Sequence, residues 1–273
     1  MEKKRVLFIT QEIFPFLPKS EIASTSRRLP QVIQESGKEI RVFTPRYGVI
    51  NERRHQLHEV IRLSGLNISI DDNDHPLIIK VASVSAAKMQ VYFIDNEDYF
   101  KRKSVLVDDK GKFHKDNDER SIFFCRGVIE TVKNLGWQPD VIHCHGWLTG
   151  LMGLYIKHAF GNDPHFANTK VVYSMYNDCF DTPWDKRFAE KLILDGFSEE
   201  IANQFNTTDC LSLVKSMVNF CDGVNVASEN LSADLREIFD NATCLKQDFV
   251  PEENQAKEIG SLFDEVIAGN ILA

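Results

Sequence analysis

Apolar and polar positions along this chain alternate between two patterns. Short runs that are almost entirely apolar and rich in β-branched residues are separated by longer stretches in which apolar residues recur at helical spacing. Strands of nearly continuous apolar character are typical of a parallel sheet that is covered by helices on both faces. The runs that we expect to form such strands are residues 5–10, 39–44, 140–143, 170–175 and 223–227.

Helical spacing marks the stretches between several of these runs. The helices expected at residues 20–36 and 118–135 are each followed by a glycine, Gly37 and Gly136, which commonly ends a helix. Pro30 should kink the first of them. Two further helices are expected at residues 149–160 and 232–239.

Residues 47–112 interrupt this alternation with short strands and a polar turn at residues 71–74. We therefore predict an α/β fold: a doubly wound, mostly parallel Rossmann-like sheet with helices on both faces and a β-rich insertion at about residues 47–112. One domain should cover residues 1–245, followed by an acidic tail, residues 246–273, with one amphipathic turn or helix. The short strands expected in the insertion are residues 65–70, 77–83 and 89–94.

A doubly wound sheet binds its ligands at the carboxyl ends of its strands. The loops that matter for function are therefore residues 11–20, 143–149 and 176–184. No G-x-G-x-x-G follows the first strand, and the G-x-x-x-x-G-K-[ST] and G-x-S-x-G motifs are missing. We accordingly expect no cofactor, and no cluster of side chains with metal-ligand spacing stands out.

Composition narrows the choice of partners. The chain has 273 residues with 32 Lys plus Arg, 40 Asp plus Glu and a formal net charge of −8. This balance argues against a nucleic-acid binder, which needs a clustered excess of cations. No apolar stretch approaches the roughly 18 residues of a membrane-spanning helix, and the apolar run at residues 6–9 is too short for a signal peptide. We expect a cytoplasmic protein with no membrane partner.

The chain contains six cysteines, most of them inside apolar segments, and no C-x-x-C pair. We expect reduced, packed thiols rather than a zinc site or a disulfide.

Several stretches together resemble a known family. They are QEIFPF at residues 11–16 after the first strand, Leu29-Pro30, RVFTPRYG at 41–48, DVIHCHGW at 140–147, and residues 173–177 and 215–228. In this order they resemble the N-terminal domain of bacterial glycogen synthases and plant starch synthases of the ADP-glucose type. The resemblance implies one half of a GT-B architecture, in which two Rossmann-like domains face each other across a cleft.

The first loop departs from the family pattern. Members carry Lys-x-Gly-Gly-Leu-Ala-Asp there, and the lysine and paired glycines approach the sugar nucleotide at a helix N-terminus. In this chain Pro18 stands at the position of the lysine, with Lys19 one place later. Ser20 and Glu21 replace the two glycines, and Ser24 replaces the aspartate.

These replacements change how the loop treats an anion. Glycines let backbone N–H groups close on a phosphate at a helix N-terminus, whereas Ser20 and Glu21 can serve as N-cap and first-turn acid of the helix itself. A carboxylate roughly 5 Å from one phosphate charge costs about 3 kcal/mol at an effective dielectric constant of about 20. A diphosphate is therefore disfavoured, although Lys19 would offset part of the repulsion if its side chain turned into the cleft.

The second and third loops keep part of the family pattern. Where the family reads His-x-His-Asp-Trp-His, this chain keeps His145 and Trp147 but loses the aspartate and the last histidine. The second histidine of the family lies near the transferred sugar. The alternative for His145 is that it forms, with His143, a strand-end pair whose hydrogen bonds go to the backbone. Tyr176 replaces the histidine of the family's Val-His-Asn. The ligand-cleft candidates that follow are Lys19, His145, Trp147, Asn177 and Ser228; no residue is assigned a catalytic role.

Family members continue into a second domain whose Arg, Lys and Glu groups grip the diphosphate. Because this sequence ends after the last strand and helix of the first domain, we expect a pseudoenzyme that is inactive alone and acts as a glucan-linked binding or regulatory module. Two alternatives stay open: a glucosyltransferase that is active with a separate nucleotide-binding domain, and a Rossmann-like domain for an unrelated small ligand. The partners implied are an α-glucan or ADP-glucose.

An uncovered cleft face would expose apolar side chains. Phe14, Phe16, Leu17 and Trp147 could then form a patch, and such patches usually mark an interface. We therefore expect self-association or a partner domain over the cleft, or coverage of the cleft by the tail after Asp248.

Overall fold

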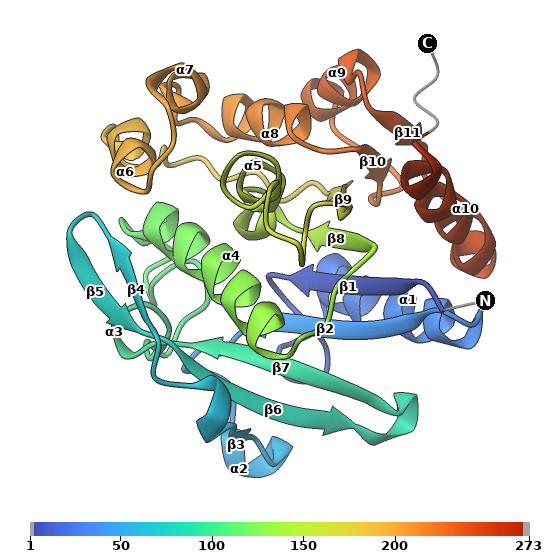
Figure 1. Cartoon of the computed structure of the whole chain (residues 1–273), viewed down its shortest axis with the longest axis horizontal. Coiled ribbons are helices and arrows are strands. Elements are labelled where there is room, and N and C mark those ends of the chain that lie inside the picture. Colours follow the sequence, from blue (N-terminus) through green and yellow to red (C-terminus); the bar gives the residue numbers. More distant parts are fainter. Residues whose placement is uncertain (1–2, 270–273) are drawn as a thin grey trace.

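The computed structural model describes residues 3–269 of the chain. Nine strands form one sheet through its middle, in the order β11-β10-β9-β8-β1-β2-β7-β6-β3 (Figure 1). The strands of this sheet are β1 (Arg5–Thr10), β2 (Glu39–Pro45), β3 (His58–Glu59), β6 (Ile78–Val84), β7 (Met89–Asp95), β8 (Val141–His145), β9 (Lys170–Met175), β10 (Gly223–Val226) and β11 (Leu245–Gln247).

Strands β11 to β7 in this order run parallel, while β6 and β3 are antiparallel to their neighbours. The five strands predicted from the sequence are confirmed and all lie in the parallel part. Their nearly continuous apolar character has a simple cause, because helices bury them from both sides. In β1, for example, every residue after Arg5 is buried.

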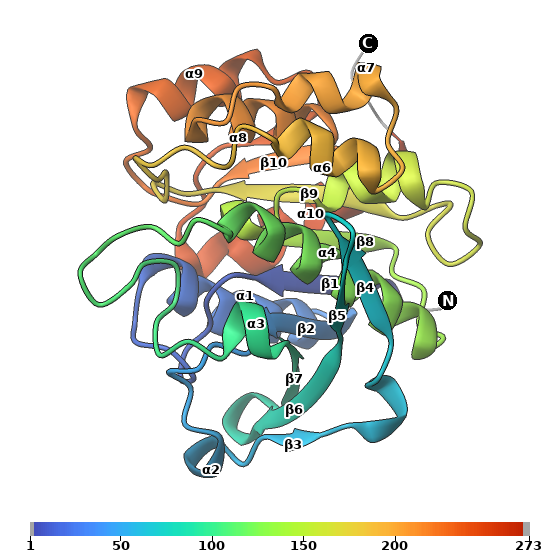
Figure 2. The same ribbon diagram turned by 90° about the vertical axis from the view of Figure 1, so that its left-hand side faces the viewer.

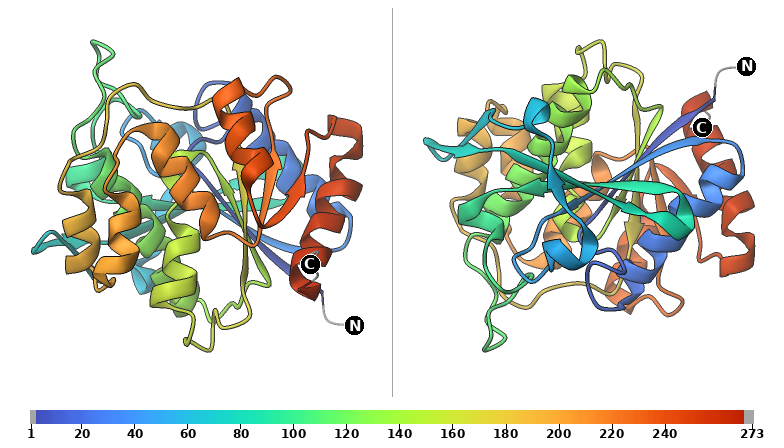
Figure 3. Two further views of the ribbon diagram at one scale, coloured as in Figure 1. Left: turned by 90° about the horizontal axis from the view of Figure 1, so that it is seen from above. Right: turned by 90° about the horizontal axis from the view of Figure 1, so that it is seen from below.

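Helices cover both faces of the sheet (Figure 3). Helices α1 and α10 pack against each other on one face, and α4, α5 and α8 lie on the other. The helices are α1 (Glu21–Glu35), α2 (Glu52–His55), α3 (Glu97–Phe100), α4 (Asn117–Asn134), α5 (Met152–Leu154), α6 (Phe188–Leu194), α7 (Glu199–Ala202), α8 (Cys210–Asn219), α9 (Ala233–Asn241) and α10 (Gln255–Ala268).

The predicted β-rich insertion at residues 47–112 is largely part of the main sheet. Strand β7 pairs in parallel with β2, and β6 pairs with β7, so both extend the sheet. Only the hairpin of β4 (Asn67–Ile70) and β5 (Asn73–Pro76) forms a separate two-stranded unit, which lies beside α4 (Figure 2). The three short strands expected at residues 65–70, 77–83 and 89–94 correspond to β4, β6 and β7, and the apolar residues of β7 complete the central core.

The single helix predicted at residues 149–160 is not formed as one regular α-helix. Helix α5 is one turn long and continues as a π-helix over Tyr155–Ala159. Farther along the chain, α6, α7 and α8 fill a region for which the sequence pattern predicted no helix. The amphipathic helix expected in the tail is α10, whose Phe263 packs against Phe8 of β1. The domain boundary at residue 245 stays a prediction.

Candidate functional site

Four polar residues lie side by side near the carboxyl ends of the central strands. Thr10 of β1 is paired with His145 of β8, His145 with Ser174 of β9, and Ser174 with Asn225 of β10. The loops that follow these strands, residues 11–20, 146–149 and 176–184, therefore meet at one edge of the sheet. Ligands of doubly wound sheets bind at this edge.

The two histidines of β8 are completely buried. His143 Nε2 lies 2.7 Å from Ser174 Oγ and 3.1 Å from Asn225 Oδ1. Burial lowers the pKa of His143 to about 4 and holds the pKa of His145 well below its ordinary value. Both rings are therefore neutral near pH 7.

His145 does not reach the surface of the cleft. Its Nδ1 lies 2.8 Å from the hydroxyl of Tyr176, which is itself buried. Its Nε2 is buried and has no hydrogen-bond partner among the described residues. A ligand could touch His145 only after Tyr176 moved, so its role as a ligand contact stays a prediction.

The polar side chains at the start of α1 form hydrogen bonds with other residues of the chain. Ser20 is the N-cap of α1: its Oγ accepts a hydrogen bond of 3.0 Å from the backbone N–H of Ala23 and donates one of 2.5 Å to Glu12. The Glu21 carboxylate accepts a hydrogen bond of 2.5 Å from Ser228 Oγ. Lys19 is exposed, and its ammonium group lies 5.4 Å from the ring centroid of Phe14. The capping role expected for Ser20 is confirmed.

Asn177 and Ser228 join the loops that follow β9 and β10. The Asn177 backbone N–H donates to Ser228 Oγ at 3.2 Å, its side-chain amide donates to the Asn230 carbonyl at 2.8 Å, and its Oδ1 accepts from the Ser232 N–H at 2.8 Å. Ser228 also binds Glu21 of α1. Three of the loops at this edge are thus tied together.

Trp147 lies at the centre of a buried aromatic cluster. The rings of Phe113, Phe180 and Trp184 lie 5.7, 5.0 and 5.7 Å from its ring, centroid to centroid. Trp147 is 2% exposed.

The expected open apolar patch is wrong, because Phe16 and Leu17 are also buried and only Phe14 of the four residues is partly exposed. Aromatic residues from loops distant in sequence cover Trp147 from within the chain.

Asp178 was missed by the sequence reasoning. Its Oδ2 accepts a hydrogen bond of 3.0 Å from the backbone N–H of Trp147. Burial of the carboxyl group raises the pKa of Asp178 to about 7, and the neighbouring Glu12 carboxylate adds to this effect. An acid placed shortly after a predicted strand, in a loop already singled out, was the available signal.

Cys179 and Cys210 form a disulfide, with their Cα atoms 5.5 Å apart. The expectation that all thiols are reduced is therefore wrong for this pair. The bond joins the loop after β9 to the first residue of α8, two positions that are 31 residues apart in the sequence. Sequence spacing gave no sign of it, because the pairing depends on how α6 and α7 fold between the two cysteines. Cys125, Cys144, Cys221 and Cys244 are free.

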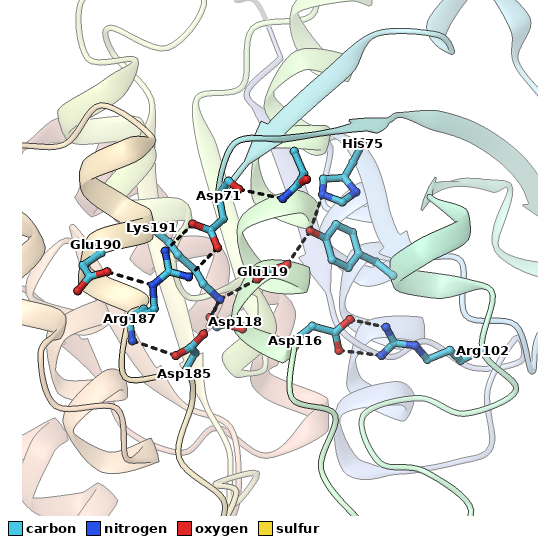
Figure 4. A network of polar contacts seen from close by, with 12 residues as sticks. Asp71, His75, Arg102, Asp116, Asp118, Glu119, Asp185, Arg187, Glu190 and Lys191 are labelled. Atoms are coloured by element: carbon cyan, nitrogen blue, oxygen red, sulfur yellow. Dashed lines mark hydrogen bonds and ion pairs between the residues drawn. The ribbon is translucent and has the colours of Figure 1, made fainter.

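Charged residues beside this segment form the network shown in Figure 4. Lys191 of α6 is buried, and its ammonium group lies 2.7 Å from Asp118 and from Glu119 at the start of α4 and 3.1 Å from Asp185. Arg187 binds Asp71 in the turn of the β4–β5 hairpin with two hydrogen bonds. The network thereby fixes α6 between α4 and the hairpin.

Residues 3–269 contain neither a cluster of metal ligands nor a membrane-spanning helix. No group of three or more His, Cys, Asp or Glu side chains in that range is placed to hold a metal ion. No helix within it has the length and apolar character needed to cross a membrane.

Comparison with known proteins identifies the family. The family model described as the starch synthase catalytic domain matches residues 5–246. The chain belongs to the starch synthase catalytic domain family. Glycogen synthase of Pelodictyon phaeoclathratiforme is 32% identical over 260 residues, which are 94% of this chain and 52% of that protein. Glycogen synthase of Chlorobium limicola is 40% identical over 174 residues, 63% of this chain and 36% of that protein.

A solved structure shares the fold of this starch synthase family member. The catalytic domain of starch synthase IV from Arabidopsis thaliana, bound to ADP and acarbose, matches with a TM-score of 0.66 at 19% identity and covers 82% of this chain and 45% of that one. The chain spans about half or less of the length of the relatives it matches. The fold is thus one half of a GT-B starch synthase catalytic domain.

The starch synthase family pattern has an aspartate after the second histidine, where this chain has Gly146. The structure explains why an aspartate would not fit at this position. Gly146 has a φ of +85° and a ψ of 155°, a conformation that is essentially restricted to glycine. A Cβ at this position would lie 2.3 Å from Cδ of Gln11. The Gln11 side chain fills the space instead, and its Oε1 accepts a hydrogen bond of 3.3 Å from the Leu148 N–H.

Proposed function

We propose that this chain is a glucan-binding domain of the glycogen and starch synthase type that does not transfer glucose by itself. The proposal rests on the N-terminus of α1, which approaches the sugar nucleotide in the family pattern. In this chain the residues at that helix end form hydrogen bonds with other residues of the chain. Ser20 caps this helix and Glu21 places a carboxylate in its first turn. A cytoplasmic location, expected from the sequence, stays a prediction.

The α1 N-terminus is a poor site for a diphosphate. Free backbone N–H groups at a helix N-terminus attract anions, but here the Ala23 N–H already donates to Ser20 Oγ. The negative charge of Glu21 repels a second anion and is held in place by Ser228. The Lys19 ammonium group, which could offset this charge, lies over the Phe14 ring instead.

Acidic groups at the same edge favour a neutral, hydroxyl-rich ligand. Glu12 and Asp178 are close enough for Glu12 to raise the pKa of Asp178, and both Glu21 and Asp178 raise the pKa of Tyr176 beyond the effect of its burial. Carboxylates accept strong hydrogen bonds from hydroxyl groups, whereas the negative charges of Glu12 and Glu21 oppose a diphosphate; Asp178, with a pKa of about 7, is only partly ionised near neutral pH. An α-1,4-glucan fits this charge distribution better than ADP-glucose does.

Calorimetry with maltoheptaose and with ADP, together with a radiolabelled transfer assay from ADP-glucose to glycogen, tests the proposal. We expect binding of maltoheptaose, weak or undetectable binding of ADP, and no transfer. Turnover by the unmodified chain would refute the pseudoenzyme part and favour an active transferase. A chain that does not bind maltoheptaose would refute the glucan part and favour an unrelated small ligand.

Replacing Glu21 by Gln tests the charge argument, because Gln keeps a partner for Ser228 and removes only the charge. At roughly 5 Å one charge pair is worth about 0.8 kcal/mol in water and about 3 kcal/mol at an effective dielectric constant of about 20. Glu21 is exposed, so we expect ADP to bind about fourfold to tenfold more tightly. Glu35→Gln, at the other end of α1, is the matched control and should change nothing. Equal affinities of the two variants for ADP would show that Glu21 does not face the ligand.

A further inference from the structure

We propose that the bond between Cys179 and Cys210 is a thiol–disulfide exchange site, at which a dithiol reductant releases the loop of residues 177–183 from the aromatic cluster around Trp147. The inference goes beyond the proposed function, because it concerns how access to this edge of the sheet is controlled. It rests on the position of the bond, the exposure of Cys179 and the small number of residues through which the rest of the loop is held.

The bond has one accessible end. Cys179 is exposed, whereas Cys210 is 4% exposed at the start of α8. Of the two residues, Cys179 is therefore the one that a thiolate in solution can approach. Exchange depends on such access to a sulfur atom.

The four remaining cysteines do not take part in the exchange reaction. Cys125, Cys144 and Cys221 are buried, and burial raises the pKa of each of these thiols. Cys244 is partly buried, and its pKa is raised to about 11. The thiolate is the reactive form of cysteine, so these four residues stay inert near pH 7.

The exchange is a two-step reaction with a dithiol. One thiolate of the reductant attacks Sγ of Cys179, which forms a mixed disulfide and breaks the bond to Cys210. The electron pair of that bond leaves on Sγ of Cys210, which takes a proton from water. The second thiol of the reductant then loses its proton and attacks the first sulfur of the reductant in the mixed disulfide. This closes the reductant's internal disulfide, and Cys179 leaves as a thiolate that takes up a proton.

Apart from Cys179, the loop is anchored at three residues, Asn177, Asp178 and Phe180. Every residue from 177 to 183 is exposed or only partly buried. Asn177 is held by its bonds to Asn230 and Ser232, and Asp178 by its bond to the Trp147 N–H. Beyond these, Phe180 packs in the aromatic cluster, with its ring centroid 4.8 Å from that of Phe113, 5.0 Å from that of Trp147 and 5.9 Å from that of Trp184. Segments with few buried contacts open locally at low free-energy cost.

The sheet beneath the loop does not depend on the bond. Strands β1, β8 and β9 are paired with one another through their backbones and are buried. The buried ion pairs of Lys191 hold α6 to α4 from within the closed segment. Reduction should therefore open the loop and uncover Trp147 while the fold persists.

Hydrogen exchange of the full chain with and without dithiothreitol, under native conditions, tests this inference. Peptide masses report the redox state of the two cysteines. We expect reduction within minutes at millimolar dithiothreitol and an increase of at least tenfold in amide exchange of residues 177–183, with unchanged exchange in β1 and β8. Cys179→Ser should show the same exchange without reductant, and Cys244→Ser, the matched control, should behave as the unmodified chain.

Three results would overturn the inference. A bond that resists dithiothreitol until denaturant is added is a permanent crosslink, and exchange of residues 177–183 that is the same in both redox states shows that other contacts hold the loop. Loss of protection throughout the sheet on reduction shows that the bond supports the whole fold. None of these readouts requires a glucan, so they are independent of the proposed function.

Discussion

Replacing Lys191 by Met removes the charge at the centre of the network in Figure 4 while keeping an unbranched side chain of similar length. The Lys191 side chain is 2% exposed and that of Asp118 is 0% exposed, with 2.7 Å between ammonium nitrogen and carboxylate oxygen. Without the cation, the carboxylate of Asp118 is buried and uncompensated. Breaking a buried ion pair in this way costs about 3–5 kcal/mol in the free energy of unfolding.

The melting temperature gives the same expectation in another form. An unfolding entropy of about 2.1 cal/mol/K per residue gives about 0.6 kcal/mol/K for a chain of 273 residues. A loss of about 4 kcal/mol therefore lowers the melting temperature by about 7 °C.

The loss of unfolding free energy in Lys191→Met should become smaller as the pH falls. Burial raises the pKa of Asp118 in the folded chain to about 6, even with Lys191 in place, and the pKa rises further in Lys191→Met. Since the folded pKa lies above the unfolded one, the folded state gains relative stability as the carboxyl group takes up a proton. The difference in unfolding free energy between the two proteins should shrink as the pH falls from 7 to 5.

Urea unfolding followed by circular dichroism measures both quantities. Arg187→Met is the matched control in the same network, because the Arg187 side chain is 52% exposed and exposed ion pairs contribute about 0–1 kcal/mol. Adding Asp118→Asn to Lys191→Met should recover part of the loss. A loss below about 1 kcal/mol at pH 7, an equal loss in Arg187→Met, or a larger loss at pH 5 would refute the reasoning.

Two further substitutions test the strand ends. Gly146→Ala should cost about 2–4 kcal/mol in urea unfolding, because its Cβ would meet Gln11 at a backbone conformation restricted to glycine. Adding Gln11→Gly should recover the contact part of that loss and not the backbone part, and full recovery would exclude backbone strain. His143 has a folded pKa of about 4 against about 6.5 when unfolded, so about 3 kcal/mol of stability present above pH 6.5 should be lost as the pH falls toward 4. The His143→Gln variant should lose less over the same range, and an NMR titration of His143 near pH 6.5 would contradict this.

The sequence was sufficient for the parts of the fold that local patterns determine. The five parallel strands are continuous apolar runs because both of their faces are buried, and the helix cap at Ser20 is set by residues next to it in the chain. The placement of β7 could not be predicted, because a buried strand has the same pattern of apolar residues whether it joins the main sheet or a separate one. Only its pairing with β2 decides the matter.

The sequence predicted the location of the site correctly, but it did not predict which side chains are accessible there. The three loops do meet at the carboxyl edge, but the burial of His145 depends on the Tyr176 hydroxyl, which comes from the neighbouring strand end. Asp178 and the disulfide depend on contacts between segments far apart in sequence. The spacing of 31 residues between Cys179 and Cys210 carries no signal of its own.

The two edges of the nine-stranded sheet bear on how the protein behaves at high concentration. One edge is β3, a strand of two exposed residues, and the other is β11, three residues long with Lys246 exposed. Long, flat, uncharged edges invite another chain to add a strand, and natural proteins avoid this with very short edge strands and lysines. Both outermost strands are thus too short to pair along a long stretch with a second copy, and strand addition at β3 or β11 is disfavoured by the fold itself.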